Sequence, residues 1–118
     1  MQLEINGKEH NLYFGLDFIE ELDNKYPIES NGAKFGMGIN TALVYLNQGN
    51  PRILADLIHA ATATANLRPG LSEIKRWVES QTDLESLFNE FLDELGKQPM
   101  TAGAVAKMKK AQEQAEAE

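Results

Sequence analysis

The sequence predicts a mainly α-helical protein of the α+β class, in which a small N-terminal β-hairpin packs on a bundle of about five helices and a polar, flexible tail follows. Apolar residues first alternate with polar ones, which is the period of a strand. They then recur every three or four residues as far as Leu95, which is the period of a helix. The chain has 118 residues, 42% of them hydrophobic, which is enough for one folded domain over residues 1–96.

The first 26 residues predict a hairpin that leads directly into an acidic helix. Asn-Gly tolerates the positive φ angles of a tight turn. Apolar residues alternate on both sides of this pair: Leu3 and Ile5 before it, and Leu12 and Phe14 after it. From Phe18 to Tyr26 the apolar spacing becomes helical. Two strands do not form a stable sheet alone, so the hairpin must pack on later helices or on another protein.

Four further helices are predicted from apolar stripes and from residues that start or stop helices; they cover residues 39–47, 50–65, 72–80 and 82–96. Asn50-Pro51 is a start signal. Thr82 and Glu85 match a capping box, and Gly96 is a stop signal. Residues 28–36 contain a second Asn-Gly pair and are either a loop or a small extra hairpin.

Residues 97–118 differ in character from the rest of the chain. They contain no aromatic residue and few large apolar ones, although Ala, Lys, Gln and Glu favour helix locally. We expect no well-buried face here, and therefore a mobile polar tail. This tail either folds on a partner or serves only solubility.

Charge and composition exclude several classes of function. The net charge is −7, and residues 1–96 hold seven Lys and Arg against fifteen Asp and Glu. Such an acidic body disfavours binding to nucleic acid. The absence of cysteine removes disulfides, thiolate nucleophiles and cysteine-ligated zinc. Because no signal segment and no membrane-length apolar run is found, we expect a soluble cytoplasmic protein that binds no membrane.

No arrangement of residues in the sequence predicts catalysis. His10 and His59 are the only histidines and have no metal-ligand spacing. His10 lies in the second predicted strand, and we expect it at the surface. Asp17, Glu20 and Glu21 begin a helix, where the macrodipole favours negative charge, so a solvated face explains them. We therefore expect no catalytic residue, no cofactor and no metal. An enzyme would need the fold to bring Asp17, Glu20 and a histidine together.

The order of elements and the wording of four segments resemble one known family. The segments are LEINGKEHNLYFGLDFIEELDNKY (3–26), NGAKFGMGINTALVYL (31–46), NPRILADLIHAATAT (50–64) and LESLFNEFLDEL (84–95). They resemble the tail assembly chaperones of long-tailed phages and prophages of Gram-positive bacteria. The resemblance spans roughly residues 1–96 and includes no catalytic signature.

The resemblance implies a non-enzymatic protein made in the cytoplasm of the host bacterium. Members of the family bind the long helical tape-measure protein, keep it soluble, and help recruit tail-tube subunits. They are generally absent from the finished virion, and many are also made as a longer frameshifted product. No defined binding motif of the family can be placed on this chain.

Candidate partner contacts are therefore chosen from the chain itself, as large apolar or amphipathic groups near turns or element ends: Tyr13, Phe35, Met37, Tyr45 and Trp77. Trp77 is either core or a binding hot spot. A client can dock as a helix in a groove or as a strand on the hairpin edge.

Two alternatives stay open at this stage. The acidic charge also fits an interaction module, such as an inhibitor or an antitoxin-like protein, that binds a basic partner in a salt-sensitive manner. Self-association is the second, because the small residues 60–65 and the two-stranded edge can each support it. The sequence selects no oligomeric state.

Overall fold

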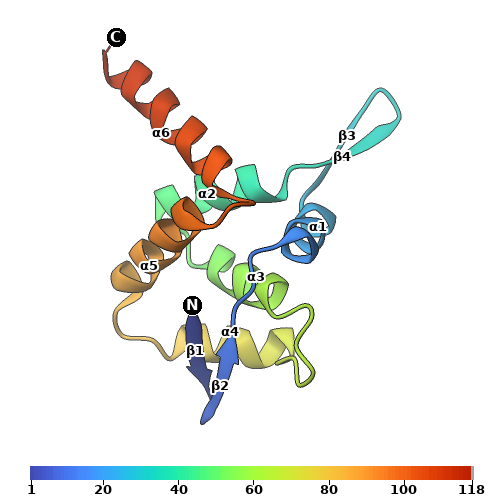
Figure 1. Ribbon diagram of the computed structural model, residues 1–118, viewed down its shortest axis with the longest axis vertical. Coiled ribbons are helices and arrows are strands. Elements are labelled where there is room, and N and C mark those ends of the chain that lie inside the picture. Colours follow the sequence, from blue (N-terminus) through green and yellow to red (C-terminus); the bar gives the residue numbers. More distant parts are fainter. Residues whose placement is uncertain (118) are drawn as a thin grey trace.

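The computed structural model describes residues 1–117, apart from the side chains of residues 30, 33–35 and 117. It confirms a mainly helical fold with an N-terminal hairpin (Figure 1). The elements follow in the order β1 (Gln2–Ile5), β2 (Lys8–Asn11), α1 (Leu16–Lys25), β3 (Pro27–Ser30), β4 (Ala33–Gly36), α2 (Gly38–Gln48), α3 (Arg52–Ala61), α4 (Leu71–Glu79), α5 (Leu84–Lys97) and α6 (Ala102–Ala117). None of the helices within residues 1–117 is long and apolar enough to span a membrane.

The N-terminal hairpin forms around the predicted turn. Asn6 and Gly7 have φ angles of 53° and 80°, as a two-residue turn between antiparallel strands requires. Leu3 and Ile5 point from β1 into the core, and His10 lies opposite Leu3 on the same face. The hairpin thus buries one face only, as expected for a two-stranded sheet on a helical body.

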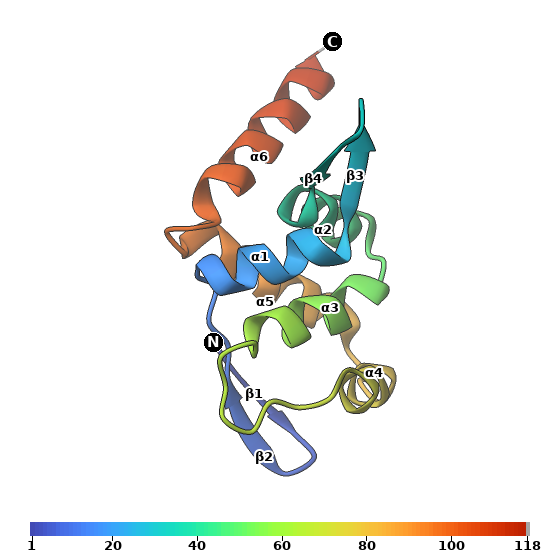
Figure 2. The same ribbon diagram turned by 90° about the vertical axis from the view of Figure 1, so that its right-hand side faces the viewer.

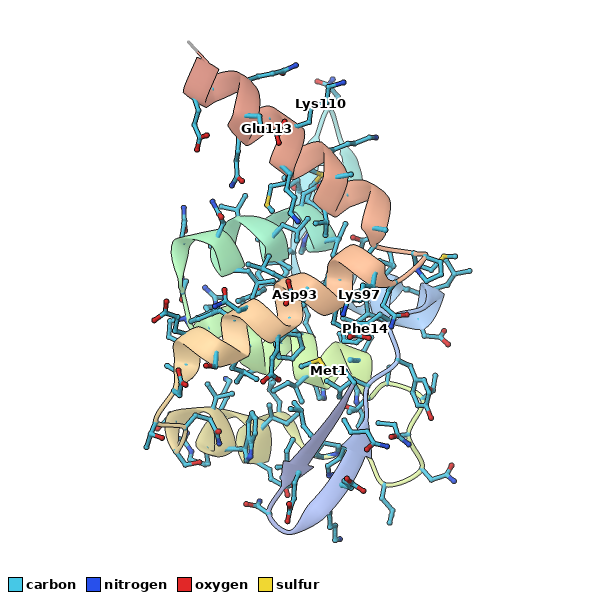
Figure 3. All side chains as sticks on the ribbon, turned by 60° about the vertical axis from the view of Figure 1, so that its left-hand side comes forward. Met1, Phe14, Asp93, Lys97, Lys110 and Glu113 are labelled. Carbon is cyan, nitrogen blue, oxygen red and sulfur yellow. The ribbon has the colours of Figure 1, made fainter. Side chains whose placement is uncertain are left out.

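Helix α3 lies at the centre of the bundle, between α1, α2 and α4 (Figure 2). Helix α3 carries apolar side chains on several sides because other helices surround it. Four of its large side chains have no exposed surface: Ile53, Leu54, Leu57 and Ile58. The second element of the core is an aromatic group that joins the N-terminal segment to α5, in which Phe14 contacts Phe18 and Phe91 edge to face (Figure 3).

Two glycines allow α2 to start directly against α1. A Cβ at Gly38 would lie 2.3 Å from the carbonyl carbon of Leu22, and one at Gly36 would lie 2.2 Å from the Cβ of Asp23. The Asp23 carboxylate accepts a hydrogen bond of 2.9 Å from the Gly38 amide, at the N-terminus of α2. Gly38 is therefore required by the close approach of the α1 backbone, whereas Gly36 leaves room for the side chain of Asp23.

Residues 27–36 form the extra hairpin that the sequence left open as an alternative. Strands β3 and β4 pair around Asn31-Gly32, whose φ angles of 53° and 78° repeat those of the first turn. This hairpin projects from the body beside α1 and α2 (Figure 1). Ile28 is about half exposed, so the described part of this hairpin buries little apolar surface.

The ends of α5 differ from the sequence signals. Asp83 is the N-cap, since its carboxylate accepts a 3.1 Å hydrogen bond from the Ser86 amide, so the predicted capping box of Thr82 is wrong. The Ser86 hydroxyl and amide lower the pKa of Asp83. Gly96 lies inside the last turn of the helix rather than beyond it, because α5 continues to Lys97.

Helix α6 corrects our prediction that residues 97–118 bury no face. Thr101 has no exposed surface, and its hydroxyl donates to the carbonyl of Leu95. Val105 is 2% exposed and packs against α5 at Gly96. Farther along α6, Lys110 and Glu113 lie away from the body (Figure 3). The mobility of this segment stays a prediction.

Candidate functional site

A set of polar side chains joins α1 to α3. The Tyr26 hydroxyl donates a hydrogen bond to Asp56, and Lys25 Nζ lies 3.0 Å from His59 Nδ1. The same ammonium is 4.0 Å from Asp56. We call these four residues, with Glu21 and Arg68, the polar seam. The seam holds the two helices in register, since its groups are largely satisfied by one another.

Arg68 extends the polar seam to the loop that follows α3. One guanidinium nitrogen donates to Glu21 on α1 and, at 2.6 Å, to the carbonyl of His59 near the end of α3. Arg68 therefore fixes the course of residues 62–70 relative to α1. This loop is important because its residues 64–67 form one wall of the groove described below.

The electrostatics of the polar seam favour a structural role. Burial and the hydrogen bond to Asp56 raise the pKa of Tyr26 well above its usual range. Burial, and then the charges of Lys25 and Arg68, lower the pKa of His59 below its ordinary value. The tyrosine thus stays protonated, and the imidazole is neutral and accepts from the Lys25 ammonium.

The residues that an enzyme would need are not brought together. His59 belongs to the polar seam, His10 lines a different groove, and Asp17 lines a small hollow beside Phe18. Within residues 1–117 no group of three or more potential ligands could hold a metal ion. The absence of catalysis stays a prediction, because it is inferred only from this dispersal.

A groove of about 570 Å³ lies between the hairpin and the loop after α3. We call it the β2 groove. One wall is the outer edge of β2, and the other is the loop after α3, which consists largely of turns. Its lining residues are Lys8, Glu9, His10, Asn11, Tyr13, Thr64, Ala65, Asn66 and Leu67.

Exposed apolar side chains flank the β2 groove. Tyr13 is 57% exposed and Leu67 is 76% exposed, and both line it. Leu16, at the start of α1, is 73% exposed and borders a smaller hollow that shares Tyr13 and Thr64 with the groove. Apolar side chains gathered beside an open groove are typical of a surface that binds another protein.

The structure separates the five residues chosen from the sequence. Of the four whose side chains the structure describes, Tyr13 lines the β2 groove and the other three do not. Tyr45 packs edge to face on Tyr26, with ring centroids 6.1 Å apart, and Trp77 is partly buried against the core. Met37 is partly buried beside the start of α2. The side chain of Phe35 lies outside the described part of the chain, and contacts of all five with a partner stay predictions.

Sequence reasoning missed the second wall of the groove. Leu67 stands just before Arg68-Pro69-Gly70, outside any apolar stripe, so no periodic signal marks it. His10 was expected at the surface but is only 8% exposed. Alternation alone could have found it, because His10 has the same parity as Leu12 and Phe14.

The fold and this groove together define a small, mainly helical protein with an open groove beside its N-terminal hairpin. A family model described as phage tail assembly chaperone protein matches residues 2–110. The chain therefore belongs to this family of phage tail assembly chaperones. No curated protein and no solved structure matches the chain.

Proposed function

We propose that this protein binds the tape-measure protein of its own phage, keeps that long helical client soluble, and helps recruit tail-tube subunits to it. The proposal is carried by one observation: a member of the tail assembly chaperone family exposes Tyr13 and Leu67 in an open groove, and Leu16 at a smaller hollow beside it. A chaperone needs such apolar surface to hold an aggregation-prone client.

The charge of the chain supports the same role. Exposed carboxylates such as Asp93 lie on the side of α5 that faces away from the core (Figure 3). Like charge on the exterior keeps complexes apart and in solution. We propose that the protein acts in the cytoplasm of a Gram-positive host during tail assembly and is absent from the finished virion.

Co-expression tests this proposal directly. The tape-measure protein of the same phage is produced alone and together with the full-length tagged chaperone, and its soluble amount is measured. We expect the client to be largely insoluble alone, and soluble and co-purified when the chaperone is present. An unchanged soluble amount with no co-purification would rule out the proposed client.

Recruitment of tail-tube subunits is tested by a further addition. Purified tail-tube protein is mixed with the chaperone–client complex, with the chaperone alone, and with the client alone. We expect retention of tube protein by the complex above its retention by either component. Equal retention by the client alone would remove the chaperone from this step.

A further inference from the structure

Strand β2 has one open edge. In the β1–β2 register Ile5 lies opposite Lys8 and Leu3 opposite His10, and the Leu12 amide donates to the Met1 carbonyl at 2.9 Å. In an antiparallel pair, every second residue directs its N–H and C=O groups to the partner strand. The even-numbered residues of β2 therefore direct their backbone N–H and C=O groups to β1. Glu9 and Asn11 direct theirs outward, away from β1.

Tyr13, the next odd-numbered residue, shows that this edge can bind a backbone carbonyl. The Tyr13 amide, which continues the outward series, donates to the carbonyl of Ala61 at 2.9 Å. Among the described residues, no backbone carbonyl accepts a hydrogen bond from the amide of Glu9 or of Asn11. The edge is thus occupied at Tyr13 and open for the two positions before it. These open positions line the β2 groove.

The outer face of the hairpin carries an unbalanced charge at the same place. Glu4 and Glu9 lie directly opposite each other across the two strands, and both are exposed. Neither carboxylate has an ion pair among the described residues. Like charges in this position destabilise a sheet, so a cation added beside Glu9 would remove a local cost.

We propose that an extended segment of the client adds as a third strand to the outer edge of β2, with a Lys or Arg beside Glu9 and an apolar residue on each side of that cation. The strand would pair with the backbone of Glu9 and Asn11 inside the β2 groove. Its cation would lie beside Glu9, on the face of the sheet that also carries Glu4, and its apolar residues would point to the face that carries His10. This inference rests on the proposed chaperone function.

Hydrogen exchange of the full-length chain tests the register. The probe is the blocked peptide acetyl-Thr-Val-Lys-Val-Thr-amide, with acetyl-Thr-Val-Glu-Val-Thr-amide as its charge control. At a free concentration of about ten times the Kd, we expect exchange at Glu9 and Asn11 to slow about tenfold. The amides of Lys8 and His10, already bonded to β1, should not change.

The peptide pair also tests the charge. We expect the Glu peptide to bind about tenfold more weakly than the Lys peptide, because it adds a third carboxylate to the pair. Equal affinity of the two peptides would overturn the charge argument. Protection that misses Glu9 and Asn11, or that falls on a helix instead, would overturn the site.

Variants extend the test to the client. Glu9→Lys reverses the charge at the edge, and Asn11→Pro removes an outward amide. Glu90→Lys is the matched control, since it makes the same charge change at an exposed position of α5. We expect severalfold less co-purified tape-measure protein with the two β2 variants than with the control. If Asn11→Pro does not fold, Glu9→Lys still tests whether the client binds at the edge of β2.

The outcomes separate the two proposals. If the unchanged chain solubilises the client and Glu9→Lys does so equally well, the chaperone function stands and the strand site is wrong. If the unchanged chain does not bind the client at all, the proposed function fails. In that case the exchange pattern with the peptide still decides whether the edge accepts a basic strand.

Discussion

Gly38 is the glycine at which one added carbon atom should lower the free energy of unfolding most. A Cβ there would lie 2.3 Å from the carbonyl carbon of Leu22 and 2.5 Å from the amide of Asp23. Ordinary contact begins near 3.4 Å, so α1 and α2 would have to separate by about 1 Å. Because both obstacles are backbone, no side chain can turn aside to relieve the clash.

The cost of Gly38→Ala can be worked from this geometry. Overpacking typically costs about 1–3 kcal/mol, and weakening the hydrogen bond from the Gly38 amide to Asp23 adds about 1 kcal/mol. We therefore expect a loss of about 2–4 kcal/mol in the free energy of unfolding, a large fraction of the roughly 5–15 kcal/mol typical of a domain. The melting temperature should fall by roughly 8–16 °C.

Gly96→Ala is the matched control within the same chain. A Cβ at Gly96 would lie 3.6 Å from a Val105 methyl group, an ordinary contact, and the residue is helical. Alanine should stabilise the protein here by about 0.5–1 kcal/mol. Urea unfolding followed by circular dichroism measures both variants. An unchanged midpoint for Gly38→Ala would refute the argument from close approach.

Three further predictions concern pH, the hairpin and α6. The pKa of His59 lies below its ordinary value of 6.5, so the unfolded state takes up the proton first, and stability should fall as the pH drops from about 6.5. Urea midpoints at several pH values should show this slope, and His59→Gln should reduce it. Glu9→Lys should raise the free energy of unfolding by about 0.2–1 kcal/mol, because it places opposite charges across from each other at Glu4, while recovery of the client falls. A drop in stability instead would contradict this account of the charge pair. Val105→Ala should cost about 1–2 kcal/mol, since Val105 is 2% exposed, whereas removal of residues 113–118 should cost less than about 0.5 kcal/mol. Equal effects of these two changes would show that α6 does not pack as described.

The parts of the fold that could be predicted are those encoded locally. The Asn6-Gly7 turn, the alternation around it and the apolar stripes gave the first hairpin and five helices, because turn geometry and side-chain periodicity depend on neighbours in sequence. The sixth helix was missed because Val105 is its one fully buried large apolar side chain among the described residues, Ala104 and Met108 are only partly buried, and the buried Thr101 lies just before its start. So little apolar surface does not predict a packed helix from sequence alone. Packing on α5 stabilises this helix, and that contact exists only in the folded protein.

The β2 groove could be predicted only in part. The open hairpin edge follows from the presence of two strands, and the sequence indicated it as a docking site. The opposite wall comes from residues 64–67, more than fifty positions later in the chain. Its position depends on Arg68, which contacts Glu21 and the end of α3. Such tertiary contacts between distant residues leave no periodic signal in the sequence.

The soluble amount of the tape-measure protein, measured with and without this chain in the same cells, tests the central claim most directly. If the protein is a chaperone for that client, the soluble amount rises severalfold when the two are co-expressed, and both proteins elute together. If the client stays insoluble at the same level and nothing co-elutes, the proposed function is wrong.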